Sequence, residues 1–199
     1  MNLWNERYTE PGFLFGTDPA AFLVDQAAYL KRGQKALAIA DGEGRNSVYM
    51  AEKGVQVTAV DSSDVALDKA RGLAAARSVS VDFQLVDLAA MDWQAEAYDL
   101  AVGIFFQFAG PDFRAQIFDG LKKTLKPGGV LLLHGYTPKQ LEFGTGGPKV
   151  LENLYTVDLL QEAFGDMEIL RLEAYEREVD EGRGHSGMSA LIDLVARKK

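Results

Sequence analysis

Short apolar runs rich in β-branched residues alternate with helix-like segments, and this alternation limits the folds open to the 199-residue chain. Each apolar run ends at a glycine loop, an acidic residue or a turn, and most are followed by a segment with helical spacing of apolar residues. The predicted strands cover 36–40, 55–60, 79–86, 98–106 and 130–133, and the helices between them cover 46–53, 62–77 and 112–125. Such alternation predicts parallel strands joined by crossover helices.

The last part of the chain departs from this alternation. After a short helix predicted at 157–164, two β-rich runs at 168–178 and 188–197 follow with no helix between them. Consecutive strands without a crossover helix form an antiparallel hairpin. We therefore predict an α/β fold, a three-layer αβα sandwich whose seven-stranded sheet is mostly parallel and ends in an antiparallel C-terminal hairpin.

Composition and charge exclude several classes of protein. The net charge of −8 argues against non-specific binding to nucleic acid or anionic lipid. The chain has no cysteine, which rules out disulfides, thiol catalysis and cysteine-ligated metals. We see no secretory signal, no apolar stretch of membrane-spanning length and no metal-binding motif. The expectation is a single domain over residues 1–199, cytoplasmic, with no membrane contact and no metal.

Ligands of open α/β sheets bind where the parallel strands end. In this chain the first strand is followed by the loop DGEG (41–44), the second ends at Asp61 and the third at Asp87. The fourth and fifth strands are followed by the stretches FQF (106–108) and HGY (134–136). We expect these residues to line the site.

The glycine loop fits two classes of cofactor. Gly42 and Gly44, followed by Ser47, approximate a dinucleotide fingerprint, and Asp61 is placed to bind a ribose. However, Asp41 and Glu43 would lie beside the pyrophosphate. Each like-charge contact at ~4 Å would cost ~1 kcal/mol in water. S-adenosylmethionine has no phosphate and carries a sulfonium and an ammonium. The acidic loop therefore favours S-adenosylmethionine over NAD(P), and an NAD(P)-dependent oxidoreductase is a less favoured alternative.

The run DGEGRNSVYMAEKGVQVTAVDSS resembles the first two motifs of class I S-adenosylmethionine-dependent methyltransferases. LVDLAAMDW, YDLAVGIF and LKPGGVLLL continue the motifs of that family in order, over residues 36–135. The flanking stretches FGTDP (15–19), GTGGPK (144–149) and DEGRGHSG (180–187) are similar to a small bacterial branch called tellurite-resistance-like. The resemblance implies a Rossmann-like sheet and methyl transfer to a small-molecule nitrogen, oxygen or sulfur nucleophile.

The resemblance also implies which residues bind the cofactor. Asp61 would accept hydrogen bonds from the two ribose hydroxyls, although an aspartate there also suits a helix N-cap. Asp87 would contact the adenine amino edge with the Leu88 backbone, or would be a turn residue. Ser62 suits a helix cap as well as a ligand. The full expected set is Ala40, Asp41, Gly42, Gly44, Asn46, Asp61, Ser62, Asp87 and Leu88.

The loop departs from the family pattern at two positions. The family usually has an acid where this chain has Ala38, and glycine where it has Ala40. Asp41 is expected to replace the missing acid, which normally orders the loop or holds the ammonium of the cofactor.

The two histidines differ in their expected surroundings. His134 ends an apolar strand and suits a structural role. His185 lies in a glycine-rich loop, where it could be solvated or could act as the general base for a hydroxyl acceptor.

The segments at the two ends of the motif region are expected to form the substrate wall. Expected pocket residues are Tyr8, Phe15, Gln107, Tyr136 and Arg183, the last for an anionic substrate, with Lys149 a weaker candidate. Residues 1–25 are expected to close over the cofactor as a lid. Short insertions favour a small-molecule acceptor over nucleic acid, and a monomer or homodimer is expected. The alternative from another class is a non-catalytic protein that binds or senses S-adenosylmethionine, suggested by Ala38 and Ala40.

Overall fold

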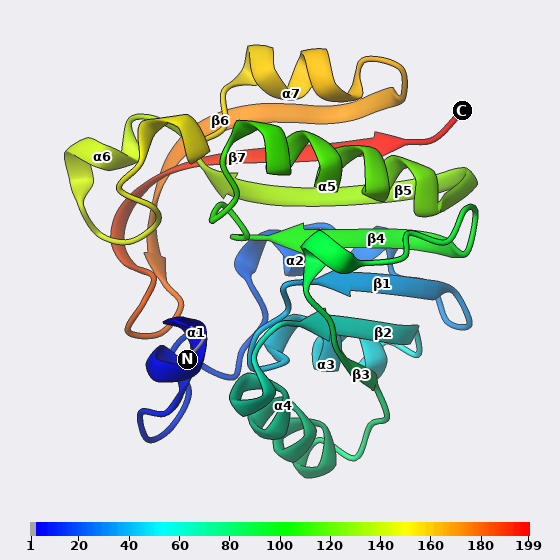
Figure 1. The fold of residues 1–199 in the computed structure, drawn as a ribbon, viewed down its shortest axis with the longest axis vertical. Helices are drawn as coiled ribbons and strands as arrows, with labels where there is room; N and C mark the ends of the chain where they lie inside the picture. Colours follow the sequence, from blue (N-terminus) through cyan, green and yellow to red (C-terminus); the bar gives the residue numbers. More distant parts are fainter. Residues whose placement is uncertain (1–2) are drawn as a thin grey trace.

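The computed structural model describes residues 3–199, and within that range seven strands form one mixed sheet (Figure 1). The order across the sheet is β3-β2-β1-β4-β5-β7-β6. The strands are β1 (Lys35–Ile39), β2 (Gln56–Asp61), β3 (Asp82–Leu85), β4 (Tyr98–Ile104), β5 (Leu125–Tyr136), β6 (Glu168–Asp180) and β7 (Ser186–Arg197). The helices are α1 (Leu3–Tyr8), α2 (Ala21–Asp25), η1 (Ala27–Tyr29), α3 (Arg45–Glu52), α4 (Asp64–Ala76), η2 (Leu88–Ala90), α5 (Pro111–Thr124), α6 (Gln140–Phe143), η3 (Leu151–Asn153) and α7 (Val157–Phe164).

The first five strands in this order, β3, β2, β1, β4 and β5, are parallel. β7 is antiparallel to β5, and β6 is antiparallel to β7. The final strand, β7, inserts between β5 and β6 and pairs with both. The predicted Rossmann-like, mostly parallel sheet with an antiparallel C-terminal hairpin is therefore confirmed.

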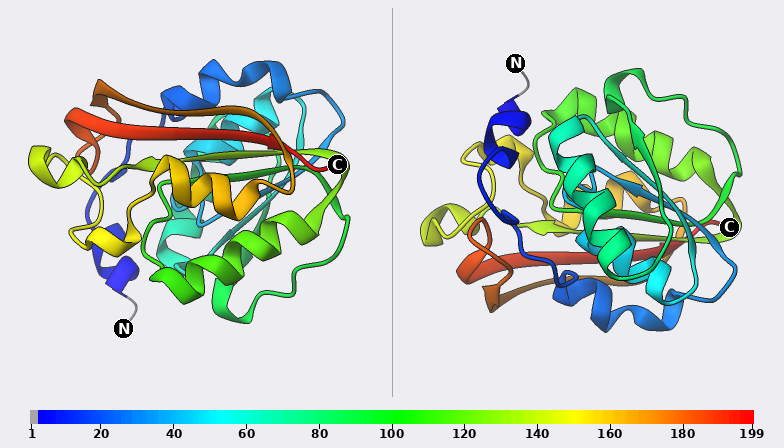
Figure 2. Two further views of the ribbon diagram at one scale, coloured as in Figure 1. Left: turned by 90° about the horizontal axis from the view of Figure 1, so that it is seen from above. Right: turned by 90° about the horizontal axis from the view of Figure 1, so that it is seen from below.

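Helices cover both faces of the sheet, which gives the three layers (Figure 2). Alternate residues of β1 point to opposite faces, as the pleat requires. Leu37 and Ile39 pack in the core on the side of α5 and α7, while Ala36 and Ala38 pack in the core on the side of α2 and α3. Burial on both faces explains why the parallel strands read as continuous apolar runs.

The largest difference from the predicted elements is at β5, which was expected over 130–133 and begins at Leu125. The segment KPGG (126–129) has the composition of a turn, but its two glycines form backbone hydrogen bonds with the residue that follows β7. The Gly128 amide donates to the Lys198 carbonyl at 2.8 Å, and the Lys198 amide donates to the Gly129 carbonyl at 2.9 Å. Pairing distant in sequence thus extends the ladder through a segment whose composition indicates a turn.

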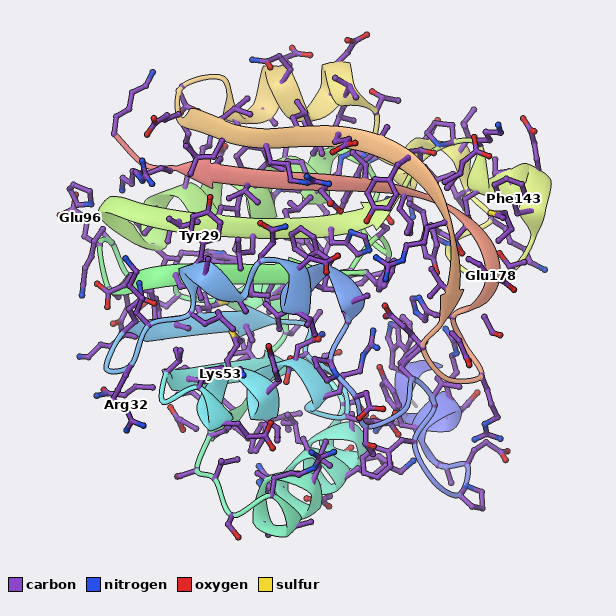
Figure 3. All side chains as sticks on the ribbon, turned by 180° about the vertical axis from the view of Figure 1, so that it is seen from behind. Tyr29, Arg32, Lys53, Glu96, Phe143 and Glu178 are labelled. Atoms are coloured by element: carbon purple, nitrogen blue, oxygen red, sulfur yellow. The ribbon has the colours of Figure 1, made fainter. Side chains whose placement is uncertain are left out.

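The carboxyl ends of the parallel strands, helix α1 and the curved tip of the β6–β7 hairpin lie at one end of the molecule (Figure 1). Seen from behind, Phe143 and Glu178 lie at this end, while Arg32 and Glu96 lie at the opposite end (Figure 3). No helix in residues 3–199 is long and apolar enough to cross a membrane.

Candidate functional site

A cavity of about 340 Å³ lies at the carboxyl ends of the strands. It is lined by the loop after β1, the ends of β2 and β3, the loop after β4, helix α1 and the hairpin tip. Most of the expected site residues line it: Tyr8, Phe15, Ala40, Asp41, Gly42, Asn46, Asp61, Ser62, Asp87, Leu88, Gln107, Tyr136 and His185. Volumes of this order are typical of small-molecule sites.

Two glycines let the loop after β1 pass close to its neighbours. Both are in the left-handed region, with φ of 59° at Gly42 and 87° at Gly44. A Cβ on Gly42 would lie 2.7 Å from the Tyr8 hydroxyl oxygen, and one on Gly44 would lie 2.7 Å from the Ala70 Cβ. Gly44 itself does not line the cavity, so its expected cofactor contact becomes a packing role against α4.

Asp61 braces this loop from the end of β2. Its Oδ2 accepts from the Gly42 amide at 2.8 Å and its Oδ1 accepts from the Ser63 amide at 2.9 Å. Burial raises the pKa of Asp61 above its ordinary value. The carboxylate therefore spans the glycine loop and the start of α4, and faces the cavity between them.

Ala40 keeps a glycine-like backbone although it is not glycine. Its φ is 46°, in the left-handed region that L-residues avoid. Ala38, two residues earlier, is an ordinary strand residue in the core. The two departures from the family loop therefore differ, because one carries backbone strain and the other carries none.

The variant Ala40→Gly is expected to raise the free energy of unfolding by about 0.5–1 kcal/mol, because it removes the Cβ from a left-handed residue. Urea denaturation measures this change. The matched control is Ala38→Gly, which should lower the free energy of unfolding by about 1 kcal/mol, because glycine weakens an extended, buried strand. Equal destabilisation by both substitutions would contradict the assignment of strain to Ala40.

Asp41 turns its carboxylate toward the first turn of α3, where the Ser47 hydroxyl donates a short hydrogen bond to it. Burial raises the pKa of Asp41 to about 7, and the nearby Asp61 adds to the rise. Asp41 also lines the cavity. Asp41 thus places an acid beside the cavity, although Ala38 occupies the position where the family usually has one. That Asp41 takes over the function of the missing acid stays a prediction.

Glu43 has a different role from the one that the charge of the loop suggested. It is 4% exposed, and its Oε2 accepts from the Leu14 amide at 2.7 Å while its Oε1 pairs with Lys69 at 3.0 Å. Its charge is thus compensated by the N-terminal strap, which we define as residues 9–18, and by α4. Glu43 thus fixes the strap, and selection for a cationic ligand stays a prediction for Asp41 alone.

A second acid, Glu181, whose side chain is 11% exposed, connects the hairpin tip to α2 and α3. Glu181 pairs with Arg45 at 2.8 Å and accepts from the Ala21 amide at 3.0 Å. The Gly184 amide also donates to the Leu14 carbonyl at 3.2 Å. These contacts close the cavity on the strap side and place Phe15 in its wall, as expected of a lid, although lid movement stays a prediction.

The remaining expected cofactor residues combine structural and cavity-facing roles. Asp87 accepts from the Ala89 amide at 2.9 Å as a cap of η2, and it also lines the cavity. The Asn46 Oδ1 accepts from the Ala20 amide at 2.9 Å. The cap of α4 is Ser63, whose hydroxyl accepts from the Ala66 amide at 3.1 Å, so the cap role considered for Ser62 belongs to its neighbour.

His185 is buried in the cavity wall and is not a solvated loop residue. Its Nδ1 lies 2.7 Å from the Tyr136 hydroxyl oxygen, and its ring lies between Phe15 and Phe105, with ring centroids 4.5 and 4.2 Å away. Burial lowers the pKa of His185 to about 3, so the ring is neutral at physiological pH. Tyr136 and Phe15 line the cavity with it, and their contact with a substrate stays a prediction.

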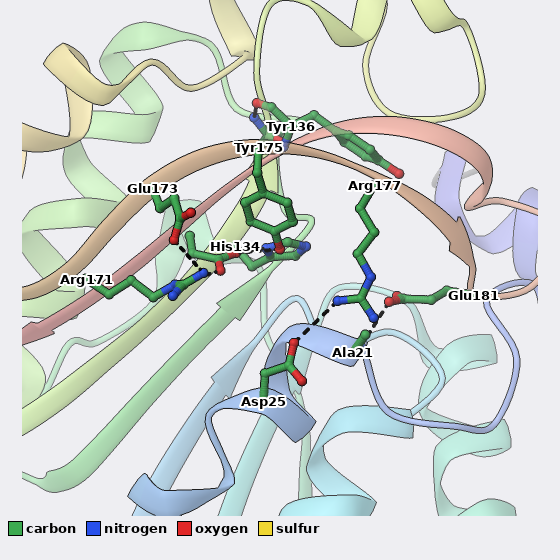
Figure 4. A network of polar contacts seen from close by, with 11 residues as sticks. Ala21, Asp25, His134, Tyr136, Arg171, Glu173, Tyr175, Arg177 and Glu181 are labelled. Carbon is green, nitrogen blue, oxygen red and sulfur yellow. Dashed lines mark hydrogen bonds and ion pairs between the residues drawn. The ribbon is translucent and has the colours of Figure 1, made fainter.

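His134 has the structural role that the sequence suggested. Its Nδ1 lies 2.7 Å from Asp193 Oδ1, and Arg171 and Tyr175 bond the same carboxylate at 3.0 and 3.1 Å. Figure 4 shows His134 of β5 and Arg171 and Tyr175 of β6 converging. The ring stacks on Phe22 of α2 at 4.9 Å, which closes it from solvent.

Two expected pocket residues differ from their predictions. Gln107 lines the cavity, but its amide is committed to the backbone, since it accepts from the Tyr136 amide at 2.6 Å and donates to the Tyr136 carbonyl at 2.8 Å. Arg183 is exposed outside the cavity and donates to the Pro11 carbonyl at 3.2 Å. The expectation that Arg183 binds an anionic substrate is therefore not supported by its position.

The sequence analysis missed several residues of the wall. Trp4 and Arg7 of α1, and Arg45 of α3, line the cavity. The amphipathic start of the chain could have indicated α1, but the partner of Arg45 is far away in sequence and no local pattern marks it. Lys149, the weaker candidate, does not line the cavity although its neighbour Pro148 does.

Comparison with known proteins places the motif region in a defined family. Residues 36–129 match the family described as a methyltransferase domain. The chain is 35% identical over 100 residues to the ubiquinone biosynthesis O-methyltransferase of Idiomarina loihiensis, covering 50% of this chain and 41% of that protein. It is 34% identical over 110 residues to the tRNA 5-carboxymethoxyuridine methyltransferase of Escherichia coli, covering 52% and 42%. The chain thus spans about two fifths of the length of these curated relatives.

The fold is shared over nearly the whole chain with solved structures. The structure of TehB from Haemophilus influenzae superposes with a TM-score of 0.72 at 21% identity, covering 98% of this chain and 66% of that one. This likeness concerns the fold alone.

Proposed function

We propose that the chain is a class I S-adenosylmethionine-dependent methyltransferase, as the match of residues 36–129 to a methyltransferase domain supports. Its cavity would bind S-adenosylmethionine and transfer the methyl group to a small-molecule nitrogen, oxygen or sulfur nucleophile. The observation that carries the proposal is the convergence of Asp61, Asp87 and the glycine loop on one cavity. A carboxylate at the end of β2 suits the vicinal hydroxyls of a ribose, and one at the end of β3 suits the adenine edge.

The chemistry that this cavity supports is an in-line displacement. The acceptor attacks the methyl carbon, the carbon–sulfur bond breaks, and S-adenosylhomocysteine leaves as a neutral thioether. The protein has to align the two reactants and exclude water, which supplies much of the rate enhancement. The strap and the hairpin tip, held by Glu43 and Glu181, are suited to exclude water.

The size and closure of the cavity support a small-molecule acceptor. Its wall at the acceptor end comes from the strap, the loop after β4 and the segment after β5, and it adjoins buried aromatic rings. A net charge of −8 opposes association with RNA. The alignment with the tRNA-modifying relative covers 52% of this chain, so the acceptor of that relative does not carry over.

Calorimetric titration of the purified protein with S-adenosylmethionine, S-adenosylhomocysteine and NAD⁺ tests the proposal. We expect both sulfur compounds to bind and NAD⁺ not to bind. Tighter binding of NAD⁺ would favour the oxidoreductase reading. Formation of S-adenosylhomocysteine with a panel of metabolites then separates an enzyme from a sensor, because a sensor binds the cofactor without consuming it.

Asp41 gives the proposal a pH dependence. A carboxyl with a pKa of about 7 is mostly protonated at pH 5.5 and half ionised at pH 7. The cofactor ammonium stays protonated over this range and favours the ionised carboxylate. Affinity for S-adenosylmethionine should therefore rise by about tenfold from pH 5.5 to 7.

The variant Asp41→Asn should bind more weakly at pH 7 and should lose most of that rise, as measured by calorimetry. The control Asp68→Asn, an exposed carboxylate paired with Arg71, should keep the wild-type rise. Unchanged affinity and pH dependence in Asp41→Asn would show that Asp41 does not replace the missing acid.

A further inference from the structure

The acceptor end of the cavity has aromatic walls. The His185 ring is in contact with Phe15 and Phe105, and it stacks on Tyr136 with ring centroids 5.6 Å apart and an interplanar angle of 20°. Phe105 is held there by a left-handed backbone, φ 55°, and by a 3.0 Å hydrogen bond from its amide to the His134 carbonyl. A bulky residue in this conformation is strained, so the fold holds this ring in place at a cost.

The cavity lacks a histidine built as a general base. Among residues 3–199, no carboxylate forms an ion pair with His185, whose Nδ1 is taken by the Tyr136 hydroxyl. The histidine that does pair with a carboxylate, His134, is 2% exposed beneath Phe22 and does not line the cavity. A hydroxyl acceptor needs a base within reach, and this arrangement supplies a neutral imidazole that two aromatic rings desolvate.

The charges around the cavity do not favour an anionic acceptor. Arg45 is paired with Glu181 at 2.8 Å, and Arg7 stacks on Trp4 at 4.6 Å at the edge of the cavity. Asp41 and Asp61 add negative potential. A thiolate would enter a site in which the buried cation, Arg45, already pairs with the Glu181 carboxylate, so its negative charge would lack a free partner there.

We propose that the acceptor is a neutral amine. The aromatic wall formed by Phe15, Phe105, Tyr136 and His185 binds the ammonium that methylation produces. The inference rests on the proposed function and narrows its acceptor class. The amine lone pair forms the new nitrogen–carbon bond, the carbon–sulfur bond breaks, and its electron pair stays on sulfur. The positive charge thus moves from sulfur to nitrogen, and the amine proton leaves to water after release.

Aromatic faces suit this reaction because the reacting centre carries one positive charge throughout, which passes from sulfur to nitrogen. Cation–π attraction stabilises a positive centre beside an aromatic ring, most strongly when it is desolvated. No base has to act before the attack, which agrees with the partners of the two histidines.

The test uses the complex of the full chain with S-adenosylhomocysteine and three probes of similar size. Tetramethylammonium represents the methylated product, tert-butanol is its neutral counterpart and trimethylacetate is the anionic one. Ligand-observed NMR titration should show tetramethylammonium binding about tenfold more tightly than tert-butanol, and trimethylacetate more weakly than both. Binding of tert-butanol or trimethylacetate as tight as that of the cation would overturn the proposal.

Variants of the aromatic wall test whether these residues cause the preference for tetramethylammonium. Phe105→Leu should reduce the preference for the cation about fivefold, and Phe15→Leu serves if the first variant does not fold. Phe143→Leu, on α6 and outside the cavity wall, is the matched control and should keep it. A preference that survives both Phe105→Leu and Phe15→Leu would also overturn the proposal. The same samples are titrated with S-adenosylhomocysteine, whose failure to bind refutes the proposed function itself and not only its acceptor class.

Discussion

Replacing Asp193 with alanine should lower the free energy of unfolding by about 3–5 kcal/mol. The carboxylate is 3% exposed and bonds three side chains at once, His134, Arg171 and Tyr175. Its removal leaves the buried His134 imidazole and the half-buried Tyr175 phenol without their acceptor, where water replaces it poorly, while the exposed Arg171 guanidinium keeps its pair with Glu173. Urea denaturation followed by circular dichroism measures the change.

The control for this prediction lies on the other side of the same arginine. Glu173 also pairs with Arg171, at 2.8 Å, but its side chain is 53% exposed. Glu173→Ala should cost at most about 0.5 kcal/mol, because exposed ion pairs contribute little. A loss of less than about 1 kcal/mol in Asp193→Ala would mean that water satisfies the three donors, and the network would then not stabilise the hairpin.

Replacing Asp61 with alanine should affect both stability and ligand binding. Two buried amides, those of Gly42 and Ser63, lose their acceptor, at about 1–3 kcal/mol each. If the carboxylate also binds the ribose hydroxyls, affinity for S-adenosylmethionine should fall by about 100-fold or more. Urea denaturation and calorimetric titration at a temperature where the variant is folded measure the two effects separately.

Asp68→Ala is the reference for this experiment, since Asp68 is an exposed aspartate on the neighbouring helix α4 and pairs only with Arg71 in the structure. It should change neither quantity measurably. Asp61→Ala with reduced stability and unchanged affinity would limit Asp61 to bracing the loop, and the ribose would need another acceptor.

The layers of this fold and its mostly parallel sheet follow from local patterns that the sequence displays. Buried parallel strands show as apolar runs, and α5 shows its apolar stripe at Ile117, Phe118 and Leu121. The ends of elements were predicted less well. β5 was predicted to begin five residues too late because its beginning depends on hydrogen bonds to Lys198, which is remote in sequence.

The candidate site was predictable where it depends on strand ends and not where it depends on long-range pairing. Asp61, Asp87 and the glycine loop line the cavity because parallel strands bring their carboxyl ends together. Glu43 looked like a ligand-selecting charge and instead holds Leu14, 29 residues away in sequence. The pairing of Arg45 with Glu181 spans 136 residues and has no local sign in the sequence.

The insertion of β7 between β5 and β6 has a consequence for synthesis of the protein. While the chain is being made, β6 leaves the ribosome before the strand that is its sole partner in the sheet, and the edge of β5 stays open until residues 186–197 emerge. Open strand edges recruit other chains. A nascent chain that stalls before Ser186 would therefore expose unpaired edges on both strands, and protection from aggregation would depend on translation passing this point without a pause.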